Sequence, residues 1–254
     1  MATLTAVESS NGQLRVDDGG AGGVPVVFVH GLGGRSELWG PAVGAVRAMR
    51  RAVAYDLRGH GASDVDGSYA IGDHVTDLGR VVDAIGAPKV VLVGHSSAGA
   101  LLMVYASRHP AKVAGAVYVD AVAGRPGGTP ASEYAGLLDA ASRPDGRRRW
   151  YEALLENARP ATRARVLASL DATPGDVFVD TARAMFTFDP RPYLKSKVLR
   201  GAIVAGEGDD PDLAHQALAI RDVHVLYGVS HWLMLDDPGR FEVALVDLLA
   251  GFPG

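Results

Sequence analysis

A strand-like run that leads directly into a serine is the strongest chemical signal in the sequence. Residues 90–93 are apolar, and the segment 94–98 (Gly-His-Ser-Ser-Ala) follows them and precedes a helical pattern. A sharp strand-to-helix turn exposes its central side chain if the residues two before and two after it are small. Gly94 and Ala98 meet that condition around Ser96. The sequence therefore predicts that Ser96 is a nucleophile for acyl transfer.

Two alternatives to this assignment exist. Ser97 could be the nucleophile with Gly99 as the second small residue, but the large side chain of His95 would then stand where a small one is needed. The segment could also be an ordinary strand–loop–helix connection in which the serines cap the helix. The placement of the other candidate residues favours Ser96 over both.

A second strand-like run, 26–29, ends in the glycine-rich segment 30–34 (His-Gly-Leu-Gly-Gly). Glycines let backbone N–H groups approach a substrate oxygen closely. Acyl-transfer sites take one oxyanion donor from such a loop and one from the residue after the nucleophile. The backbone amides of Leu32 and Ser97 are the predicted donors. A dinucleotide-binding fingerprint is excluded, because Ser36 stands where its third glycine should be.

The nucleophile needs a base, and His231 has the best position among the eight histidines. It follows the last strand-like run, 223–227, and precedes the last amphipathic segment, 237–252. The carboxyl ends of the strands are where ligand sites collect in open α/β sheets. His231 is therefore the predicted general base.

The base needs a carboxylate that orients it. Asp209 follows the strand-like run 199–205 and is the predicted partner of His231. Asp120 is the main alternative, because it ends the run 113–119 in the same manner. Glu207 and Asp210 are weaker alternatives, since either could cap a helix that begins near residue 211.

The elements that must position these residues alternate along the chain. Amphipathic spacing predicts helices over 70–86 and 237–252, and Asn11-Gly12 predicts a hairpin between 3–9 and 13–16. Strands separated by helices imply parallel pairing, with helices on both faces of the sheet. The strand-like runs are 26–29, 51–55, 90–93, 113–119, 199–205 and 223–227.

Residues 124–195 break this alternation. They contain no convincing strand but are dense in aromatic residues and show helical patterns over 132–141, 147–157, 160–170 and 176–186. We predict a helical cap, or lid, over 124–195 and a core domain from 1–123 and 196–254. The predicted walls of the substrate pocket are Tyr134, Trp150, Phe186 and Phe188 of the cap, with Met103 and Trp232 of the core.

With these motifs in this order, the chain resembles the α/β-hydrolase fold. The order Ser, Asp, His, the elbow at Ser96 and the glycine-rich loop carry the resemblance, and so do the segments 56–64, 206–209 and 231–241. The resemblance implies a mostly parallel eight-stranded sheet with a lid inserted after the sixth strand. It also implies that the loop 56–64 is mostly structural. Ala98, in place of the more common glycine, is a small departure.

The predicted function is that of a serine hydrolase. It cleaves a carboxylic ester or lactone of a small hydrophobic substrate through an acyl-enzyme, and it needs neither a metal nor an organic cofactor. A C–C bond hydrolase or a cofactor-free perhydrolase would use the same triad. A ligand receptor on a hydrolase scaffold, with little turnover, is the alternative from another class.

Composition agrees with a globular protein that acts on a small molecule. The 254 residues carry a formal charge of −4, which gives no basic footprint for nucleic acid. The sequence has no cysteine, which excludes disulfides and thiolate chemistry. Neither a signal peptide nor a membrane-spanning segment is visible, so we expect a soluble cytoplasmic protein with no membrane partner. The sequence leaves the oligomeric state open.

Overall fold

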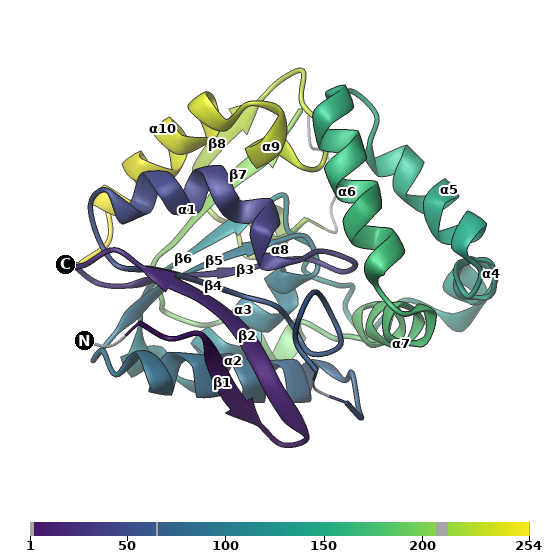
Figure 1. Ribbon diagram of the computed structural model, residues 1–254, viewed down its shortest axis with the longest axis horizontal. Helices are drawn as coiled ribbons and strands as arrows, with labels where there is room; N and C mark the ends of the chain where they lie inside the picture. Colours follow the sequence, from purple (N-terminus) through teal and green to yellow (C-terminus); the bar gives the residue numbers. More distant parts are fainter. Residues whose placement is uncertain (1–2, 65, 207–212, 254) are drawn as a thin grey trace.

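An eight-stranded sheet forms the centre of the molecule (Figure 1). The structure is a computed structural model that describes residues 3–64, 66–206 and 213–253. The strand order is β1-β2-β4-β3-β5-β6-β7-β8; β1 pairs with β2 and β2 with β4 in antiparallel fashion, and the remaining pairs are parallel. The strands are β1 Ala6–Ser9, β2 Gly12–Gly19, β3 Val26–Val29, β4 Ala52–Tyr55, β5 Val90–His95, β6 Val113–Val119, β7 Arg200–Ala205 and β8 Asp222–Leu226. The predicted mostly parallel α/β sheet is confirmed.

The central strands are buried on both faces, which explains why their sequences are continuous apolar runs. Their register brings the carboxyl ends together, since Val29 pairs with Gly94 and Gly94 pairs with Tyr118. The residues that follow β3, β5 and β6 therefore meet at one edge of the sheet. This edge is where the predicted chemical residues lie.

Helices cover both faces of the sheet (Figure 1). The helices α2 (Ile71–Ile85) and α3 (Ala98–Arg108) share one core cluster on one face, and α1 (Gly40–Arg47) and α10 (Pro238–Ala250) share the other. The sequence did not indicate α1, because its two glycines are poor helix formers, although its proline stands in the first turn, where proline is tolerated. Burial of Ala42, Val43 and Val46 against the sheet stabilises it instead.

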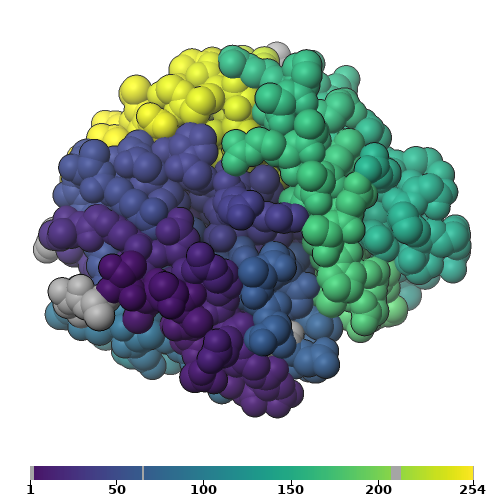
Figure 2. Space-filling model, in the orientation of Figure 1, coloured from purple at the N-terminus to yellow at the C-terminus, as the bar shows by residue number. Residues whose placement is uncertain are grey.

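Four helices lie between β6 and β7, beside the carboxyl edge of the sheet (Figure 1). They are α4 Ala131–Ala141, α5 Pro144–Leu154, α6 Pro160–Ala172 and α7 Gly175–Phe186, close to the four helical patterns in the sequence. Figure 2 shows α6, in green, packed beside the short 3-10 helix η1 (Ser36–Trp39) that precedes α1, where Arg165 donates to the Glu37 carbonyl at 2.9 Å. The division of the chain into a core and a cap over 124–195 stays a prediction.

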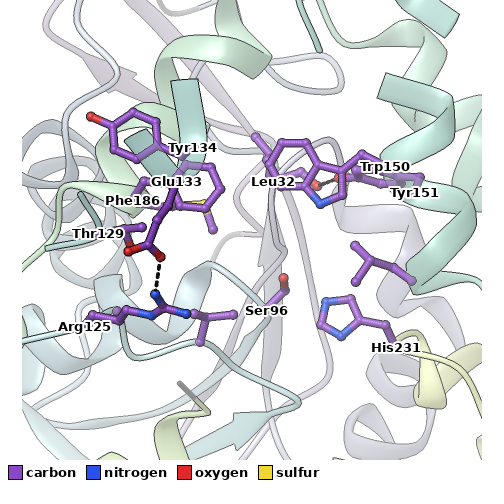
Figure 3. A pocket seen from close by; sticks show the side chains of 14 residues that line it. Leu32, Ser96, Arg125, Thr129, Glu133, Tyr134, Trp150, Tyr151, Phe186 and His231 are labelled. Atoms are coloured by element: carbon purple, nitrogen blue, oxygen red, sulfur yellow. Dashed lines mark hydrogen bonds and ion pairs between the residues drawn. The ribbon is translucent and has the colours of Figure 1, made fainter. Parts of the chain in front are cut away.

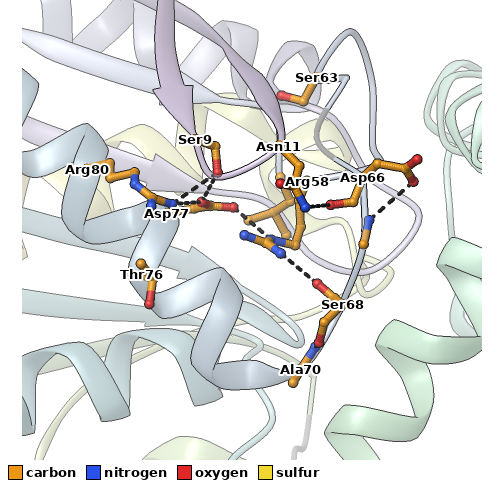
Figure 4. Close-up of polar contacts among 12 residues, drawn as sticks. Ser9, Asn11, Arg58, Ser63, Asp66, Ser68, Ala70, Thr76, Asp77 and Arg80 are labelled. Carbon is orange, nitrogen blue, oxygen red and sulfur yellow. Dashed lines mark hydrogen bonds and ion pairs between the residues drawn. The ribbon is translucent and has the colours of Figure 1, made fainter.

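The loop 56–63 is held by polar groups beside the glycine-rich loop. The Asp56 carboxylate accepts hydrogen bonds from the Ser36 amide at 2.7 Å and the Ala62 amide at 2.8 Å. Arg58 forms an ion pair with Asp77 at 2.8 Å, and both side chains are almost fully buried (Figure 4). These contacts give the loop a structural role.

Among the helices of the described residues, none combines the length and the apolar character required to span a bilayer.

Candidate active site

Ser96 stands at the sharp turn between β5 and α3. Its φ of 55° is rare for a residue with a Cβ atom. The turn is crowded: a Cβ atom on Gly94 would lie 2.7 Å from Leu102 Cδ1, and one on Gly31 would lie 2.8 Å from Ser96 Cβ. Small residues at these positions are therefore required for Ser96 to occupy the tip, as the sequence pattern predicts.

Ser97, the alternative nucleophile, has an ordinary helical φ of −56°. Its side chain is buried, and its Oγ accepts a hydrogen bond from the Leu32 amide at 2.8 Å. The hydroxyl therefore points at the glycine-rich loop, and Ser97 is absent from the lining of the cavity that Ser96 enters. This geometry favours Ser96 over Ser97.

His231 lies on the loop between β8 and α9 (Leu233–Asp236), and its ring contacts a carboxylate. The distance from His231 Nδ1 to Asp120 Oδ2 is 2.6 Å, and each side chain is 11% exposed. Asp120 directly follows β6 and has a φ of 41°. Its other oxygen, Oδ1, accepts from the Ala205 amide at 3.0 Å. Asp120 thus connects the end of β7 with the imidazole.

The surroundings of Asp120 keep its carboxyl group ionised. Burial alone would raise its pKa, but the hydrogen bond from His231, the nearby imidazole and the Ala205 amide together hold the pKa below its ordinary value. An ionised Asp120 requires a proton on His231 Nδ1, which leaves Nε2 free to accept one. His231 is therefore in the tautomer that a general base needs.

The predicted acid, Asp209, lies outside the described residues, so its position is not compared with His231. The carboxylate that contacts His231 is Asp120, the main alternative in the sequence. The sequence reasoning prefers Asp209, but β6 and β7 are neighbours that end at the same edge of the sheet, so the order of the strands does not separate the two residues.

Ser96 and His231 line the same cavity, which has a volume of about 310 Å³ (Figure 3). Most of its walls are apolar or aromatic, which suits a small hydrophobic ligand. The lining residues are Leu32, Ser96, Val122, Gly124, Arg125, Thr129, Glu133, Tyr134, Trp150, Tyr151, Leu154, Met185, Phe186 and His231.

Three of the six predicted wall residues line this cavity: Tyr134, Trp150 and Phe186. Tyr134 and Phe186 stack with their ring centroids 5.1 Å apart, and Trp150 lies 5.9 Å from Phe186. These three aromatic side chains come from α4, α5 and α7, so different helices build one wall.

The other three predicted wall residues do not line the cavity. Met103 lies in the middle of α3, a helix that is buried on nearly all sides. Trp232 is buried between the rings of His231 and Tyr151, at 5.1 and 5.4 Å. Phe188 turns away and stacks on Tyr193 at 5.8 Å. Each is apolar, but Met103 and Trp232 fill the core and Phe188 lines a neighbouring groove.

The sequence reasoning missed a polar group at one end of the cavity. Arg125 and Glu133 form an ion pair of 2.6 Å, on the far side of Ser96 from His231 in Figure 3. Nothing in their spacing indicates a site. Tyr151 was also missed as a wall residue, although its place beside Trp150 among the aromatic residues of 124–195 was a usable signal. The remaining missed lining residues are Val122, Gly124, Thr129, Leu154 and Met185.

The predicted oxyanion donors lie beside Ser96. The Leu32 amide donates to Ser97 Oγ in this structure. The Ser97 amide has no acceptor within the described part of the chain. Ser97 is the N-cap residue of α3, and the partial positive charge of a helix N-terminus favours an anion there. The roles of the two amides stay predictions.

His95, the residue before Ser96, contacts the loop after β8 that carries His231, the predicted base; we call this segment the base loop. Its Nε2 lies 2.8 Å from the backbone carbonyl oxygen of His231, and the two rings are 4.5 Å apart. Burial, together with the nearby His231, lowers the pKa of His95 to about 3. His95 is therefore neutral at pH 7 and donates from Nε2 to that carbonyl.

Within residues 3–64, 66–206 and 213–253, no cluster of three or more His, Asp or Glu side chains could hold a metal ion. The arrangement of Ser96, His231 and Asp120 supports nucleophilic chemistry by side chains alone.

Comparison with known sequences gives matches along most of the chain. Residues 26–244 match the model of a family described as the alpha/beta hydrolase family. The 3-oxoadipate enol-lactonase 1 of Acinetobacter baylyi is 25% identical over 239 residues, which cover 89% of this chain and 87% of that protein. A Variovorax paradoxus protein, whose name marks it only provisionally as a carbamate hydrolase, is 41% identical over 106 residues. That match covers 41% of this chain and 40% of that relative.

Comparison with solved structures gives matches of similar extent. A thermophilic esterase from Thermogutta terrifontis has a TM-score of 0.83 at 19% identity and covers 99% of both chains. The enol-lactonase of Burkholderia xenovorans has a TM-score of 0.83 at 19% identity, over 96% of this chain and 99% of that one. These similarities show a shared fold.

Proposed function

Because this chain belongs to the alpha/beta hydrolase family, we propose that it hydrolyses a carboxylic ester or a lactone through an acyl-enzyme. Ser96 is the nucleophile, His231 the general base, and Asp120 the carboxylate that orients His231. One observation carries this proposal: Ser96 with its positive φ and the His231 ring held by Asp120 open into the same cavity.

The first half of the reaction forms the acyl-enzyme. His231 Nε2 takes the proton of the Ser96 hydroxyl while Ser96 Oγ attacks the substrate carbonyl carbon. Asp120 stabilises the resulting imidazolium. The tetrahedral intermediate collapses when the imidazolium gives its proton to the leaving oxygen. The C–O bond of the ester then breaks, and the acyl group stays on Ser96.

The second half returns the enzyme to its starting state. Neutral His231 takes a proton from water, and the hydroxide formed attacks the acyl carbon. The collapse of this second intermediate breaks the bond to Ser96, which regains a proton from His231. The products are a carboxylic acid and an alcohol, or one hydroxy acid if the substrate is a lactone.

The oxyanion of both intermediates is stabilised by the amides of Ser97 and Leu32. The Ser97 amide is free to donate, whereas the Leu32 amide must exchange Ser97 Oγ for the substrate oxygen. Two such donors in a buried site lower the barrier by about 3 kcal/mol each.

The substrate is small and mostly hydrophobic. The cavity of about 310 Å³ has aromatic walls from α4, α5 and α7, so we propose that the segment 124–195 covers the bound substrate as a cap. The names of the esterase and enol-lactonase relatives agree with an ester or a lactone as the bond that is cleaved.

A substrate screen with matched serine variants tests this function. The wild-type chain should hydrolyse p-nitrophenyl esters of short chain length or simple lactones, and Ser96→Ala should reduce kcat by about 10⁴-fold or more. Ser142→Ala is the control, because Ser142 lies on the surface at the end of α4 and should retain wild-type rates. Turnover by Ser96→Ala at the wild-type rate would refute the assignment. A single burst followed by no steady turnover would instead favour a ligand receptor.

A further inference from the structure

The helix α5 contacts both loops of the proposed site. The Tyr151 hydroxyl donates to the Leu32 carbonyl oxygen at 2.5 Å, and the Leu154 carbonyl accepts from the His231 amide at 3.3 Å. Residues three apart lie on the same side of a helix. One face of α5 therefore contacts the glycine-rich loop after β3 and the base loop after β8, two segments far apart in the sequence.

Side chains hold three successive carbonyl groups of the glycine-rich loop. His30 Nδ1 lies 2.7 Å from the Gly31 oxygen, Tyr151 donates to the Leu32 oxygen, and Ser169 Oγ donates to the Gly33 oxygen at 2.9 Å. Only the first of these donors comes from the core around the sheet. Tyr151 and Ser169 come from α5 and α6, so the conformation of the loop depends on the helices of 124–195.

Tyr151 can approach the glycine-rich loop because residue 33 of that loop is a glycine. Gly33 has a φ of 61°, and a Cβ atom there would lie 2.7 Å from the Tyr151 hydroxyl oxygen. The Tyr151 side chain is buried, and its ring packs against Trp232 at 5.4 Å and Phe178 at 5.8 Å. The rings fix the position of the hydroxyl group, and a buried hydrogen bond of this kind restrains the peptide that accepts it.

We infer that Tyr151 is a positioning residue: by holding the Leu32 carbonyl it fixes the Leu32–Gly33 peptide, and thereby the orientation of Leu32, whose own N–H binds the oxyanion, so that α5 completes the active site. The inference rests on the proposed acyl-transfer function. Since α5 also contacts the His231 amide, displacement of this helix releases the oxyanion loop and the base loop together. Catalysis is therefore possible only while α5 is docked on the core.

The test removes the hydroxyl group and keeps the ring. Tyr151→Phe should lower kcat for a p-nitrophenyl ester by about tenfold or more, because a misaligned donor costs mainly transition-state stabilisation. KM should stay within about twofold, because the wall of the cavity is unchanged. Tyr55→Phe is the matched control: the Tyr55 hydroxyl is buried in β4 without a hydrogen-bond partner among the described residues, so both constants should match the wild type.

A second variant keeps the test conclusive if Tyr151→Phe folds poorly. Ser169→Ala removes the donor to the Gly33 carbonyl, and it should also lower kcat more than it raises KM. A thermal melt of each variant identifies those that are folded. A folded Tyr151→Phe or Ser169→Ala protein with the wild-type kcat would overturn the inference, as would an effect on KM alone.

Hydrogen exchange separates this inference from the proposed function. Amide exchange in residues 31–34 should be faster in Tyr151→Phe than in the wild type and unchanged in Tyr55→Phe. If the wild type shows no Ser96-dependent turnover, the proposed function fails, and this measurement alone decides whether Tyr151 restrains the loop. Equal exchange in the wild type and Tyr151→Phe would overturn the positioning role.

Discussion

Backbone strain marks the two residues that the proposed chemistry needs most. Ser96 and Asp120 directly follow the neighbouring strands β5 and β6 and have φ angles of 55° and 41°. Only two other non-glycine residues of the described chain, Asn157 and Ala219, have a positive φ. Strained conformations persist where the surrounding structure fixes them and often occur at functional sites. This strain supports Asp120 as the partner of His231, independently of the hydrogen bond between them.

A comparison of two aspartate variants tests this assignment. Asp120→Asn should reduce kcat by about 10³- to 10⁴-fold, because an amide cannot stabilise the imidazolium and its NH₂ group favours the wrong tautomer. Asp209→Asn should cause a much smaller loss. Steady-state kinetics of the two variants with one ester substrate measures the difference, and a larger loss in Asp209→Asn would restore the original sequence prediction.

At the scale of elements, the loop 56–63 is fixed by buried charges rather than by regular secondary structure. Asp77 in α2 accepts from Arg58 and also contacts Ser9 and Arg80 (Figure 4). The network connects the first hairpin, the loop and a helix on one face of the sheet. Removal of one partner of a buried ion pair is costly, because it leaves the other charge without compensation.

Two arginine variants measure how much this network contributes to the free energy of unfolding. Arg58→Met should lower the free energy of unfolding by about 3 kcal/mol, because Arg58 is 3% exposed and its partner Asp77 is 1% exposed. Arg80→Met should cost about 1 kcal/mol or less, because the Arg80 side chain is 36% exposed. Urea denaturation monitored by circular dichroism gives both values. Equal losses in the free energy of unfolding in the two variants would show that the burial of Arg58 does not determine how much it stabilises the protein.

A substitution in the helix α1 should raise the free energy of unfolding instead of lowering it. Gly44 lies within α1, and a Cβ atom there would meet no atom within 4 Å. Gly44→Ala should therefore raise the free energy of unfolding by about 0.5–1 kcal/mol. Gly61→Ala is the contrasting variant, because Gly61 has a φ of 56° and its Cβ atom would lie 2.2 Å from Asp56 Oδ2. Thermal melts should move in opposite directions, and a destabilised Gly44→Ala protein would contradict the prediction.

For the whole molecule, four fully buried histidines link stability to pH. Burial lowers the pKa of His30, His60, His74 and His95, with values of about 3 for His60 and His95. In the unfolded chain each would titrate near 6.5. Below pH 6.5 the unfolded state therefore binds protons that the folded state does not, and stability falls as pH falls.

The expected slope is large between pH 6.5 and 5. Each of these histidines contributes up to about 1.4 kcal/mol of lost stability per pH unit. Carboxyl groups add little in this range, because their ordinary pKa values lie near 4. Urea denaturation at several pH values from 7.5 to 5 measures how steeply the free energy of unfolding changes with pH. His60→Phe should reduce this slope by the contribution of one histidine. A free energy of unfolding that is constant over this range would contradict this account.

Local sequence patterns were enough to predict the fold, and they also led to Ser96 and His231 as residues of the proposed site. Short, β-branched apolar runs such as 113–119 indicate strands buried on both faces, and their alternation with amphipathic segments predicts a mostly parallel sheet. The small residues around Ser96 and the place of His231 after the last strand are local features, so they are visible without a structure.

The contacts between residues far apart in the sequence became visible only in the folded structure. Asp120 and Asp209 both follow strands that end at one edge, and sequence spacing does not show which carboxylate reaches His231. Met103 and Phe188 look like pocket residues until the packing of their side chains is known. The contact of Tyr151 with Leu32 joins residues 119 positions apart. Such contacts depend on how helices pack against the sheet, and side-chain packing over long sequence separations leaves no local pattern in the chain.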